Sequence, residues 1–533
     1  MLVHLMLALG VWPILPDPPP LRLLSIMNRA DKSLIERILT ARVYDVAKET
    51  PLDFAKNLSQ RLDNQIFLKR EDLQPVFSFK LRGAFNRMFH LTPEERARGV
   101  VAASAGNHAQ GVALAGKTLG IRTIIVMPKV APDIKINAVK SFGGEVVIHG
   151  NNFDEAYAHA RHLEQVEGMS FVHPFDDLDV IAGQGTIAME LLRQHPDPID
   201  AVFLAVGGGG LVAGVGSYLK YLYPHTKIIS VEHEEAPTLY ASMKAGHRVQ
   251  LSQVGTFADG AAVKLIGERS FEIAKQVVDE VILVNTDETC AAIKDVFEET
   301  RTLLEPAGAL GVAGIKKYIE EQGWQGQHLI AITSGANINF DRLRHVAERA
   351  ELGEGREVLL AVTIPEEPGS FKQFCRAIGN RSITEFNYRY ADSKDAQVFA
   401  GVKIAAGKGE REKLLAELRA QNYSFVDMTD NEVAKVHLRY MVGGHGQGVK
   451  NELIYRFMFP ERPGALLHFL TSMSAGWNIS LFHYRNHGSD FGRVLVGIQV
   501  PPEERAEFDQ TLEQLGYEYW DETNNPAYQR FLG

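Results

Sequence analysis

One lysine and one glycine run, far apart in the chain, have the residue types of a phosphate-binding chemical site. A strand-like segment at 202–206 leads into Gly207-Gly208-Gly209-Gly210-Leu211, and a helical pattern follows at 212–223. Glycines between a strand and a helix let several backbone N–H groups converge on a phosphate at the positive end of the helix. Lys80, in Ser78-Phe79-Lys80-Leu81-Arg82-Gly83, would hold the other end of the same ligand.

The glycine run alone also fits a dinucleotide site. Gly208, Gly210 and Ala213 satisfy the pattern G-x-G-x-x-A, and Glu232 follows about 20 residues on, where a ribose-binding acid is expected. An NAD(P)-dependent oxidoreductase is therefore an open alternative on this motif. Three further motifs favour the lysine site, because a dinucleotide fold gives no reason for them. They are Ser104-Ala105-Gly106-Asn107-His108, Glu305-Pro306-Ala307-Gly308 and Thr333-Ser334-Gly335-Ala336-Asn337.

Taken in order, these segments resemble those of pyridoxal-phosphate enzymes of the tryptophan synthase β fold type, and most closely the biosynthetic threonine dehydratases. The resemblance covers roughly residue 30 to the C-terminus. It implies an α/β fold with a two-lobed catalytic domain of parallel-type sheets (PLP fold type II) and a C-terminal α+β pair of ACT-like repeats. It also implies pyridoxal 5'-phosphate as cofactor and conversion of L-threonine to 2-oxobutanoate and ammonia, with L-serine as a secondary substrate.

The resemblance gives Lys80 two roles: it binds the cofactor covalently and it takes the proton from the substrate Cα. A lysine that forms a Schiff base must be partly neutral, and an apolar, cation-rich setting lowers its pKa. We expect Phe77, Phe79 and Leu81 to supply the apolar part of that setting. Arg82 is expected to pair with an acid.

Other motif residues receive roles from the same resemblance. Asn107 is implied to bond the ring hydroxyl of the cofactor, and Ser334 to meet the pyridine nitrogen. The Gly207–Leu211 run becomes a phosphate cradle that relies on backbone donors, since no lysine or arginine lies within it. The substrate carboxylate is implied to bind the loop of Ser104, Ala105, Gly106, Asn107 and His108.

Two plainer interpretations of these motifs stay open on the residues alone. Ser104 or Asn107 would cap a helix at 109–119, and Glu305 would be the last helical residue before Pro306. Either interpretation would explain its residues without any ligand.

Length and composition set wider limits. A chain of 533 residues exceeds one ordinary core and predicts two or three domains. A net charge of −10 argues against broad nucleic-acid binding. Cys290 and Cys375 lie far apart and are expected to be buried thiols of a reducing, cytoplasmic compartment. The apolar run at 2–14 is too short for a membrane span of about 20 residues, so residues 1–28 are expected to be a disordered extension.

The pattern from residue 100 onward predicts parallel strands separated by helices. Such an alternation indicates a parallel sheet covered on both faces, with ligands at the carboxyl ends of its strands. The expected strands are 100–104, 122–127, 145–148, 202–206 and 227–231.

An internal repeat follows a polar, linker-like stretch at 351–356. The segments that begin at Ile364 and Ile383 recur at Phe459 and Ile479, which are 95 and 96 positions later. An offset this constant indicates duplication. We expect a catalytic domain at 29–350 and ACT-like domains at 357–430 and 451–525.

The resemblance implies that isoleucine inhibits through these repeats, that valine opposes it, and that the enzyme is a homotetramer. The equivalent Tyr388 and Tyr484 are the expected effector contacts. A pair of dimerisation domains without ligand is the alternative. His483 and His487 form H-x-x-x-H across a strand end, and no metal is expected there.

Overall fold

The computed structural model describes residues 29–531, apart from 132, 366–369, 380, 382, 391–394, 406–408, 441–449, 461–468, 470–476 and 486–490. The extension expected at 1–28 lies outside this part of the chain. Among the described helices, none combines the length and the apolar character that crossing a membrane requires.

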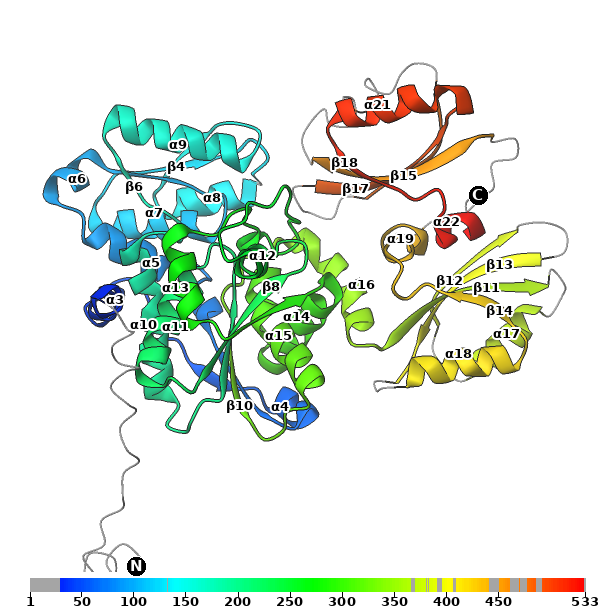
Figure 1. The fold of residues 1–533 in the computed structure, drawn as a ribbon, viewed down its shortest axis with the longest axis horizontal. Helices are drawn as coiled ribbons and strands as arrows, with labels where there is room; N and C mark the ends of the chain where they lie inside the picture. The colour runs from blue at the N-terminus through cyan, green and yellow to red at the C-terminus, as the bar shows by residue number, and fades with distance from the viewer. Residues whose placement is uncertain are drawn as a thin grey trace, which may run out of the picture.

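The larger lobe of the N-terminal part is built on a six-stranded sheet in the order β1-β2-β10-β7-β8-β9 (Figure 1). All neighbours pair in parallel except β1 and β2, which are antiparallel. The strands are β1 (Leu52–Phe54), β2 (Gln65–Lys69), β7 (Ala201–Ala205), β8 (Lys227–His233), β9 (Glu280–Val284) and β10 (His328–Ile332).

The smaller lobe has its own parallel sheet, in the order β5-β4-β3-β6. All five strands expected between 100 and 231 form, but they belong to two sheets instead of one. The pattern alone indicated one sheet, which was wrong because hydrophobic periodicity predicts a strand without indicating its neighbour. The two-lobed arrangement with separate sheets, which the resemblance implied, is confirmed. The strands are β3 (Val100–Ala103), β4 (Thr123–Met127), β5 (Glu145–Ile148) and β6 (Ser170–Phe171).

Helices cover both faces of the large sheet, as the alternating side chains of β7 show. Val202 and Leu204 pack against α10 (Leu178–Gln194) and α11 (Gly210–Leu222) on one face. Phe203 points to the other face and packs against α14 (Thr286–Thr300) and α15 (Pro306–Gln322). Successive residues of a strand point to opposite faces, so a strand buried on both sides is apolar throughout.

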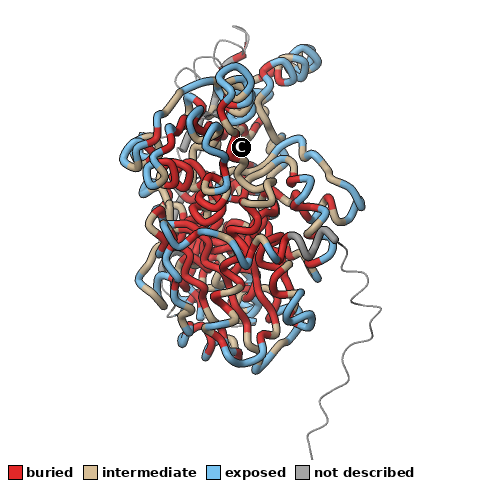
Figure 2. Tube along the Cα trace, turned by 90° about the vertical axis from the view of Figure 1, so that its left-hand side faces the viewer, coloured by how far each residue is buried: buried red, intermediate tan, exposed pale blue. Residues whose placement is uncertain are grey.

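Buried residues fill the middle of the molecule, and the exposed ones lie mainly in loops and outer helices (Figure 2). Cys290 is buried and free, as expected, whereas the side chain of Cys375 lies outside the described residues. The other helices before the repeats are α3 (Arg29–Leu39), α4 (Lys56–Leu62), α5 (Lys80–Phe89), α6 (Pro93–Arg98), α7 (Asn107–Leu119), α8 (Asp133–Ser141), α9 (Phe153–Glu167), α12 (Thr238–Ala245), α13 (Glu268–Val277) and α16 (Leu343–Gly353).

The expected linker at 351–356 is mostly structured. Helix α16 continues to Gly353, and Leu352 is buried in an apolar cluster shared with the repeats. Strand β11 then begins at Glu357. Hydrophobic periodicity could not indicate this helix end, because Leu352 is the one large apolar residue of the stretch.

Each C-terminal repeat forms a four-stranded antiparallel sheet. Both sheets have the same strand order, and both have a register irregularity at one place, between Ile383 and Glu385 and between Ile479 and Leu481. A shared irregularity 96 positions apart confirms the duplication. The elements are β11 (Glu357–Pro365), α17 (Ser370–Ile378), β12 (Ile383–Tyr390), β13 (Asp395–Lys403), α18 (Glu410–Ala420) and β14 (Ser424–Asp427), α19 (Glu432–Val436) between the repeats, and then β15 (Glu452–Pro460), β16 (Asn478–Arg485), β17 (Phe491–Gln499), α21 (Arg505–Leu515), β18 (Glu518–Asp521) and α22 (Pro526–Phe531).

Candidate functional site

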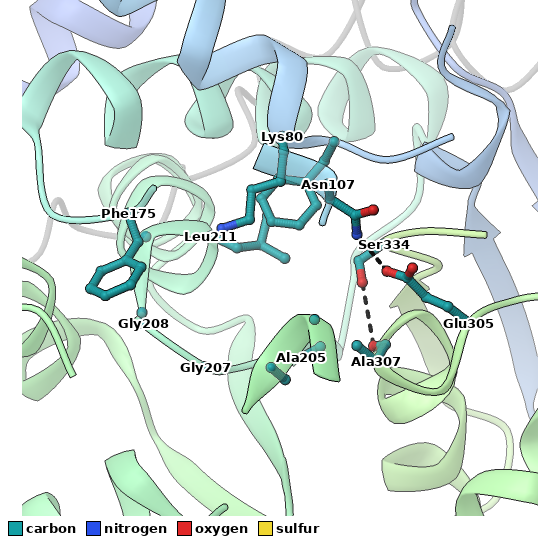
Figure 3. A pocket seen from close by; sticks show the side chains of 15 residues that line it. Lys80, Asn107, Phe175, Ala205, Gly207, Gly208, Leu211, Glu305, Ala307 and Ser334 are labelled. Atoms are coloured by element: carbon teal, nitrogen blue, oxygen red, sulfur yellow. Dashed lines mark hydrogen bonds between the residues drawn. The ribbon is translucent and has the colours of Figure 1, made fainter. Parts of the chain in front are cut away.

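The expected site residues meet at a pocket beside the carboxyl ends of β7 and β10, with α5 across it (Figure 3). Its empty space is about 450 Å³, counting space open to solvent. Lys80, Asn107, Ser334 and the whole of Gly207–Leu211 line it. The structure therefore brings together four segments that the sequence separates.

Lys80 is the first residue of α5 and points into the pocket (Figure 3). Its Nζ donates a hydrogen bond to the carbonyl oxygen of Pro174 at 2.9 Å. Burial lowers the pKa of Lys80 to about 8, although the nearby Glu305 acts in the opposite direction. Near neutral pH a useful fraction of this amine is therefore neutral and nucleophilic.

The cause of the lowered pKa was only partly predicted. Phe79 lines the pocket, but Phe77 is 55% exposed and Leu81 packs in a separate buried cluster. The neighbouring cations do not contribute, because each is neutralised by an acid: Lys69 pairs with Glu190 at 2.6 Å, for example. Burial, and not cation crowding, explains the shift of the Lys80 pKa.

Arg82 has the acid partners that were expected. It lies one half-turn beyond Lys80 and bridges Glu71 at 2.7 Å and Glu190 at 2.6 Å, and all three side chains are completely buried. Removing one member of such a buried network leaves a charge without its partner, which costs about 3–5 kcal/mol. The network fixes the start of α5 against α10 and thereby fixes the position of Lys80.

The glycine run has the geometry of an anion cradle. Helix α11 begins at Gly210, after Gly209 in the left-handed region (φ 87°) with no side-chain cap. The first N–H groups of a helix have no partner within it and favour an anion. A Cβ on Gly208 would stand 2.1 Å from the ring of Phe175, so the run is held tightly under that ring. Among the residues that line the pocket, Lys80 supplies the positive charge.

Glu232 does not serve as a ribose-binding acid. It is fully buried, and its carboxylate accepts hydrogen bonds from the N–H groups of Leu239 at 2.7 Å and Tyr240 at 2.8 Å. Burial raises the pKa of Glu232 to about 8 against the effect of these hydrogen bonds. Glu232 anchors α12, so the acid that a dinucleotide site would need to bind the ribose is not available.

Asn107 is held between two side chains of the large lobe. Its Nδ2 donates to Glu305 Oε1 at 2.6 Å, and Nδ2 of Asn337 donates to its Oδ1 at 2.6 Å. Burial and then Asp259 raise the pKa of Glu305 to about 7. This chain of hydrogen bonds fixes the Asn107 amide at the wall of the pocket.

Both of the plainer interpretations, the helix cap at Ser104 or Asn107 and the helix end at Glu305, were wrong. The residue that precedes α7 is Gly106, which makes no side-chain cap, and Asn107 is already helical. Glu305 comes immediately before α15 and does not end a helix. The sequence does not distinguish a helix-capping residue from a polar residue that faces a ligand, because the same residue types occur at both positions beside a helix end.

Of the expected substrate loop, only Asn107 lines the pocket. Oγ of Ser104 accepts a hydrogen bond from the Gly106 N–H at 3.2 Å. His108 is buried against the carbonyl oxygen of Val172 at 2.8 Å, and burial lowers its pKa to about 3. A substrate role for Ser104, Ala105, Gly106 and His108 stays a prediction.

Ser334 follows β10. Its Oγ donates a hydrogen bond to the carbonyl oxygen of Ala307 at 3.3 Å.

Several residues around the pocket were not predicted from the sequence. Asn337 was inside a recognised motif without a role, and it orients Asn107. Other missed residues belong to no motif and line the pocket only through the fold: Phe175, Ala205, Gly260 and Ala261.

A second group of charged residues, which we call the junction cluster, joins the large lobe to the repeats. It consists of three carboxylates and three cations. The guanidinium of Arg349 in α16 donates to both oxygens of Glu432 at 3.0 Å and also pairs with Asp287. Burial alone would raise the pKa of Glu432, but Arg349 and Arg493 hold it well below its usual range. The members are Glu235, Asp287, Arg349, Glu432, Lys435 and Arg493.

The effector tyrosines are placed by their backbones alone. Tyr388 pairs with Val398 across β12 and β13, and Tyr484 pairs with Val494 across β16 and β17. These are equivalent places in the two repeats. Their side chains lie outside what the structure describes, as do those of the expected non-metal pair His483 and His487.

Comparison with known proteins agrees with this geometry. The family "Pyridoxal-phosphate dependent enzyme" matches residues 43–335, and the "C-terminal regulatory domain of Threonine dehydratase" matches 348–438 and again 443–532. The biosynthetic L-threonine dehydratase of Burkholderia multivorans is 54% identical over 94% of this chain and 100% of its own length. That of Escherichia coli is 53% identical over 93% of this chain and 96% of its own.

Solved structures resemble about three fifths of the chain. The processed form of threonine deaminase isoform 2 from Solanum lycopersicum is 50% identical with a TM-score of 0.59, over 60% of this chain and 93% of that one. Maize serine racemase is 31% identical with a TM-score of 0.56, over 59% and 96%. The chain belongs to the family of biosynthetic threonine dehydratases, which are pyridoxal-phosphate-dependent enzymes with a C-terminal regulatory domain.

Proposed function

We propose that this chain is a threonine ammonia-lyase that converts L-threonine to 2-oxobutanoate and ammonia. The observation that supports this most strongly is the lysine of lowered pKa, Lys80, facing a cradle of glycine amides across one pocket. The relatives of about half identity are named as threonine dehydratases over nearly the whole chain. Their regulatory domain is also present twice.

The pocket fits pyridoxal phosphate. The N–H groups of Gly207–Leu211 suit its phosphate, Lys80 suits its aldehyde carbon, and Asn107 suits its ring hydroxyl. Ser334 places a neutral hydroxyl for the pyridine nitrogen. A neutral partner would not keep that nitrogen protonated, which favours elimination over transamination.

When bound, the cofactor supplies an electron sink for the charge that develops at the substrate Cα. The Lys80 amine then takes the α-proton, since its lowered pKa lies near the working pH, where a general base is most effective. The backbone N–H groups of the Ser104–His108 loop and the hydroxyl of Ser104 receive the substrate carboxylate. Loss of the β-hydroxyl and hydrolysis give the net reaction, in which one L-threonine yields one 2-oxobutanoate and one ammonia.

L-serine is the secondary substrate under this proposal. It lacks one methyl group, which is worth about 1–3 kcal/mol in an apolar pocket. A related lyase that acts mainly on serine is the nearest alternative, because a serine racemase is among the similar structures.

Isoleucine is the proposed inhibitor and valine its antagonist, with Tyr388 and Tyr484 as contacts. The junction cluster offers a physical route to the pocket. Arg493 of β17 pairs with Glu235 at 3.3 Å, and the Glu235 carbonyl accepts the Gly255 N–H at 2.8 Å. The segment from Gly255 continues into Gly260 and Ala261, which line the pocket.

A steady-state assay with threonine and with serine, each with and without isoleucine and valine, tests this function. We expect the 2-oxo acid to form faster from threonine, isoleucine to inhibit, and valine to relieve the inhibition. Equal or faster turnover of serine would favour the alternative lyase. NAD(P) reduction without 2-oxo acid formation would instead support the alternative of an NAD(P)-dependent oxidoreductase. The cytoplasmic location and the homotetrameric state stay predictions. Analytical ultracentrifugation tests the subunit count.

A further inference from the structure

Two histidines and an aspartate converge at the end of the large sheet that is remote from the pocket. Nε2 of His195 and Nδ1 of His328 lie 3.1 Å apart. A carboxylate oxygen of Asp197 completes a group in which one ligand atom from each residue lies within 4.8 Å of the others. Within the described part of the chain, this is the one cluster of three or more such side chains that meets that spacing.

We propose that His195, Asp197 and His328 form a binding site for a zinc ion. Zinc takes imidazole nitrogen at about 2.0–2.1 Å in tetrahedral geometry, so two nitrogens on one ion stand about 3.4 Å apart. The measured separation needs only a few tenths of an ångström to reach that value. Two imidazoles and one carboxylate select zinc and similar first-row cations over Mg²⁺ and Ca²⁺, which prefer all-oxygen sites.

The backbone around the two imidazoles is fixed before any ion binds. His195 comes directly after α10, and its N–H donates to the Leu191 carbonyl at 2.9 Å. His328 is the first residue of β10, and its N–H donates to Asp200 Oδ2 at 2.7 Å. Ordering costs are small when ligands already stand on rigid elements.

Asp197 is the adaptable third ligand. It is exposed and lies in His195-Pro196-Asp197-Pro198, where two prolines restrict the backbone of the loop. Its side chain therefore rotates freely from a stiff support and is able to close the last gap to the ion. A fourth position remains for water, as in zinc sites with three protein ligands.

The site would act on stability and not on the chemistry of the pocket. His328 begins β10, whose other end leads to Ser334, and six residues of extended strand span about 20 Å. An ion here would tie the loop between α10 and β7 to the first residue of β10. Anything that binds only the folded state raises its stability by mass action.

The rival explanation is a simple hydrogen bond between two neutral imidazoles packed against Phe67, whose ring lies 4.6 Å from that of His195. The matched control for histidine content is the pair His149 and His159 of the small lobe, with ring centroids 4.0 Å apart. That pair has no third ligand within the same spacing among the described residues.

The test uses tag-free holoenzyme treated with EDTA, dialysed, and titrated with zinc chloride by isothermal calorimetry. We expect one Zn²⁺ per chain in the unaltered enzyme and in H159Q, with a rise in Tm of about 2 °C or more on loading. H328Q should lose this binding. D197N, whose side chain is exposed and not needed for folding, should weaken it by about tenfold or more.

Circular dichroism checks that H328Q is folded, and D197N decides the matter if it is not. Zinc affinity that is the same in D197N as in the unaltered enzyme would overturn the site and leave only a hydrogen-bonded pair. Absence of stoichiometric zinc binding by the unaltered enzyme would overturn it too. Loss of the binding in H159Q would move the site to the small lobe and equally refute the proposal.

Discussion

The pocket and the junction cluster use charge in opposite ways. The residues that line the pocket include one cation, Lys80, and one acid, Glu305, and the rest are small, apolar or neutral polar side chains. The junction cluster packs three carboxylates against three cations, with Glu432 held by both Arg349 and Arg493. In the pocket, the backbone N–H groups and Lys80 are arranged to bind the negative charge of a ligand. In the junction, charges satisfy one another.

This difference separates catalysis from control. Preorganised backbone donors are built in by folding and cannot be removed one at a time. Ion pairs between two bodies are individually breakable, and their breakage changes how those bodies sit against each other. Changes in the pocket should therefore affect cofactor and rate, whereas changes in the junction should affect inhibition.

The largest effect is expected for Lys80→Ala. Loss of the base alone should lower kcat by about 10²–10⁴-fold, and loss of the covalent cofactor link adds to this. The measurement is 2-oxo acid formation at saturating threonine with added cofactor. Lys117→Ala, an exposed lysine at the end of α7, is the control and should keep full activity. Comparable activity in both variants would remove Lys80 from the mechanism.

A smaller loss is expected for Gly208→Ala. Its Cβ would meet the Phe175 ring at 2.1 Å, and relieving such a clash costs about 1–3 kcal/mol. Cofactor affinity should fall by about 10- to 100-fold, as measured by fluorescence titration of the apoenzyme. Gly246→Ala, where the added Cβ meets no atom within 4 Å and only the left-handed backbone (φ 74°) is strained, should cost some stability and leave the affinity unchanged. Unaltered affinity in G208A would mean that the phosphate binds elsewhere.

The rate at which the apoenzyme takes up cofactor is expected to change about tenfold with pH. The neutral fraction of Lys80 rises with pH through its pKa of about 8, so cofactor uptake by the apoenzyme should speed up about tenfold from pH 7 to pH 9 and then level off. Stopped-flow absorbance follows the uptake. A rate that keeps climbing toward pH 10, near the ordinary lysine value of about 10.4, would show that Lys80 is not buried as described.

The smallest effect belongs to the junction. Arg493→Met removes the link from β17 to Glu235 and should raise the isoleucine concentration for half-inhibition by about fivefold or more. Threonine turnover without isoleucine should stay within about twofold. Arg122→Met, which breaks only exposed pairs with Glu145 and Glu167, is the control. A loss of basal rate in R493M with inhibition intact would erase the distinction between the two regions.

The chemistry-bearing parts of the site were predictable because each lies in one short stretch of chain. The glycine run and the segment around Lys80 are local patterns, and a local pattern determines its own backbone. The clamp of Asn107 by Glu305 and Asn337 was not predictable, since its members come from three places that only the folded sheet brings together.

Contacts between distant segments also account for the other features that the sequence did not predict. Strand periodicity predicted five strands between 100 and 231, but it missed the two-residue strand β6 and did not indicate the division into two sheets. Burial of Lys80 depends on Phe175 and on the carbonyl of Pro174, which share no motif with it. The junction cluster joins residues up to 258 positions apart. In a sequence, such residues look like ordinary surface charges.

The central claim is that the Lys80 amine is joined to a pyridoxal cofactor whose phosphate lies on the glycine run. The direct measurement is borohydride reduction of the holoenzyme, followed by proteolysis and mass spectrometry. We expect one pyridoxyl phosphate group per chain, on the peptide that contains Lys80. An adduct on another lysine, or a holoenzyme that yields no adduct at all, would contradict it.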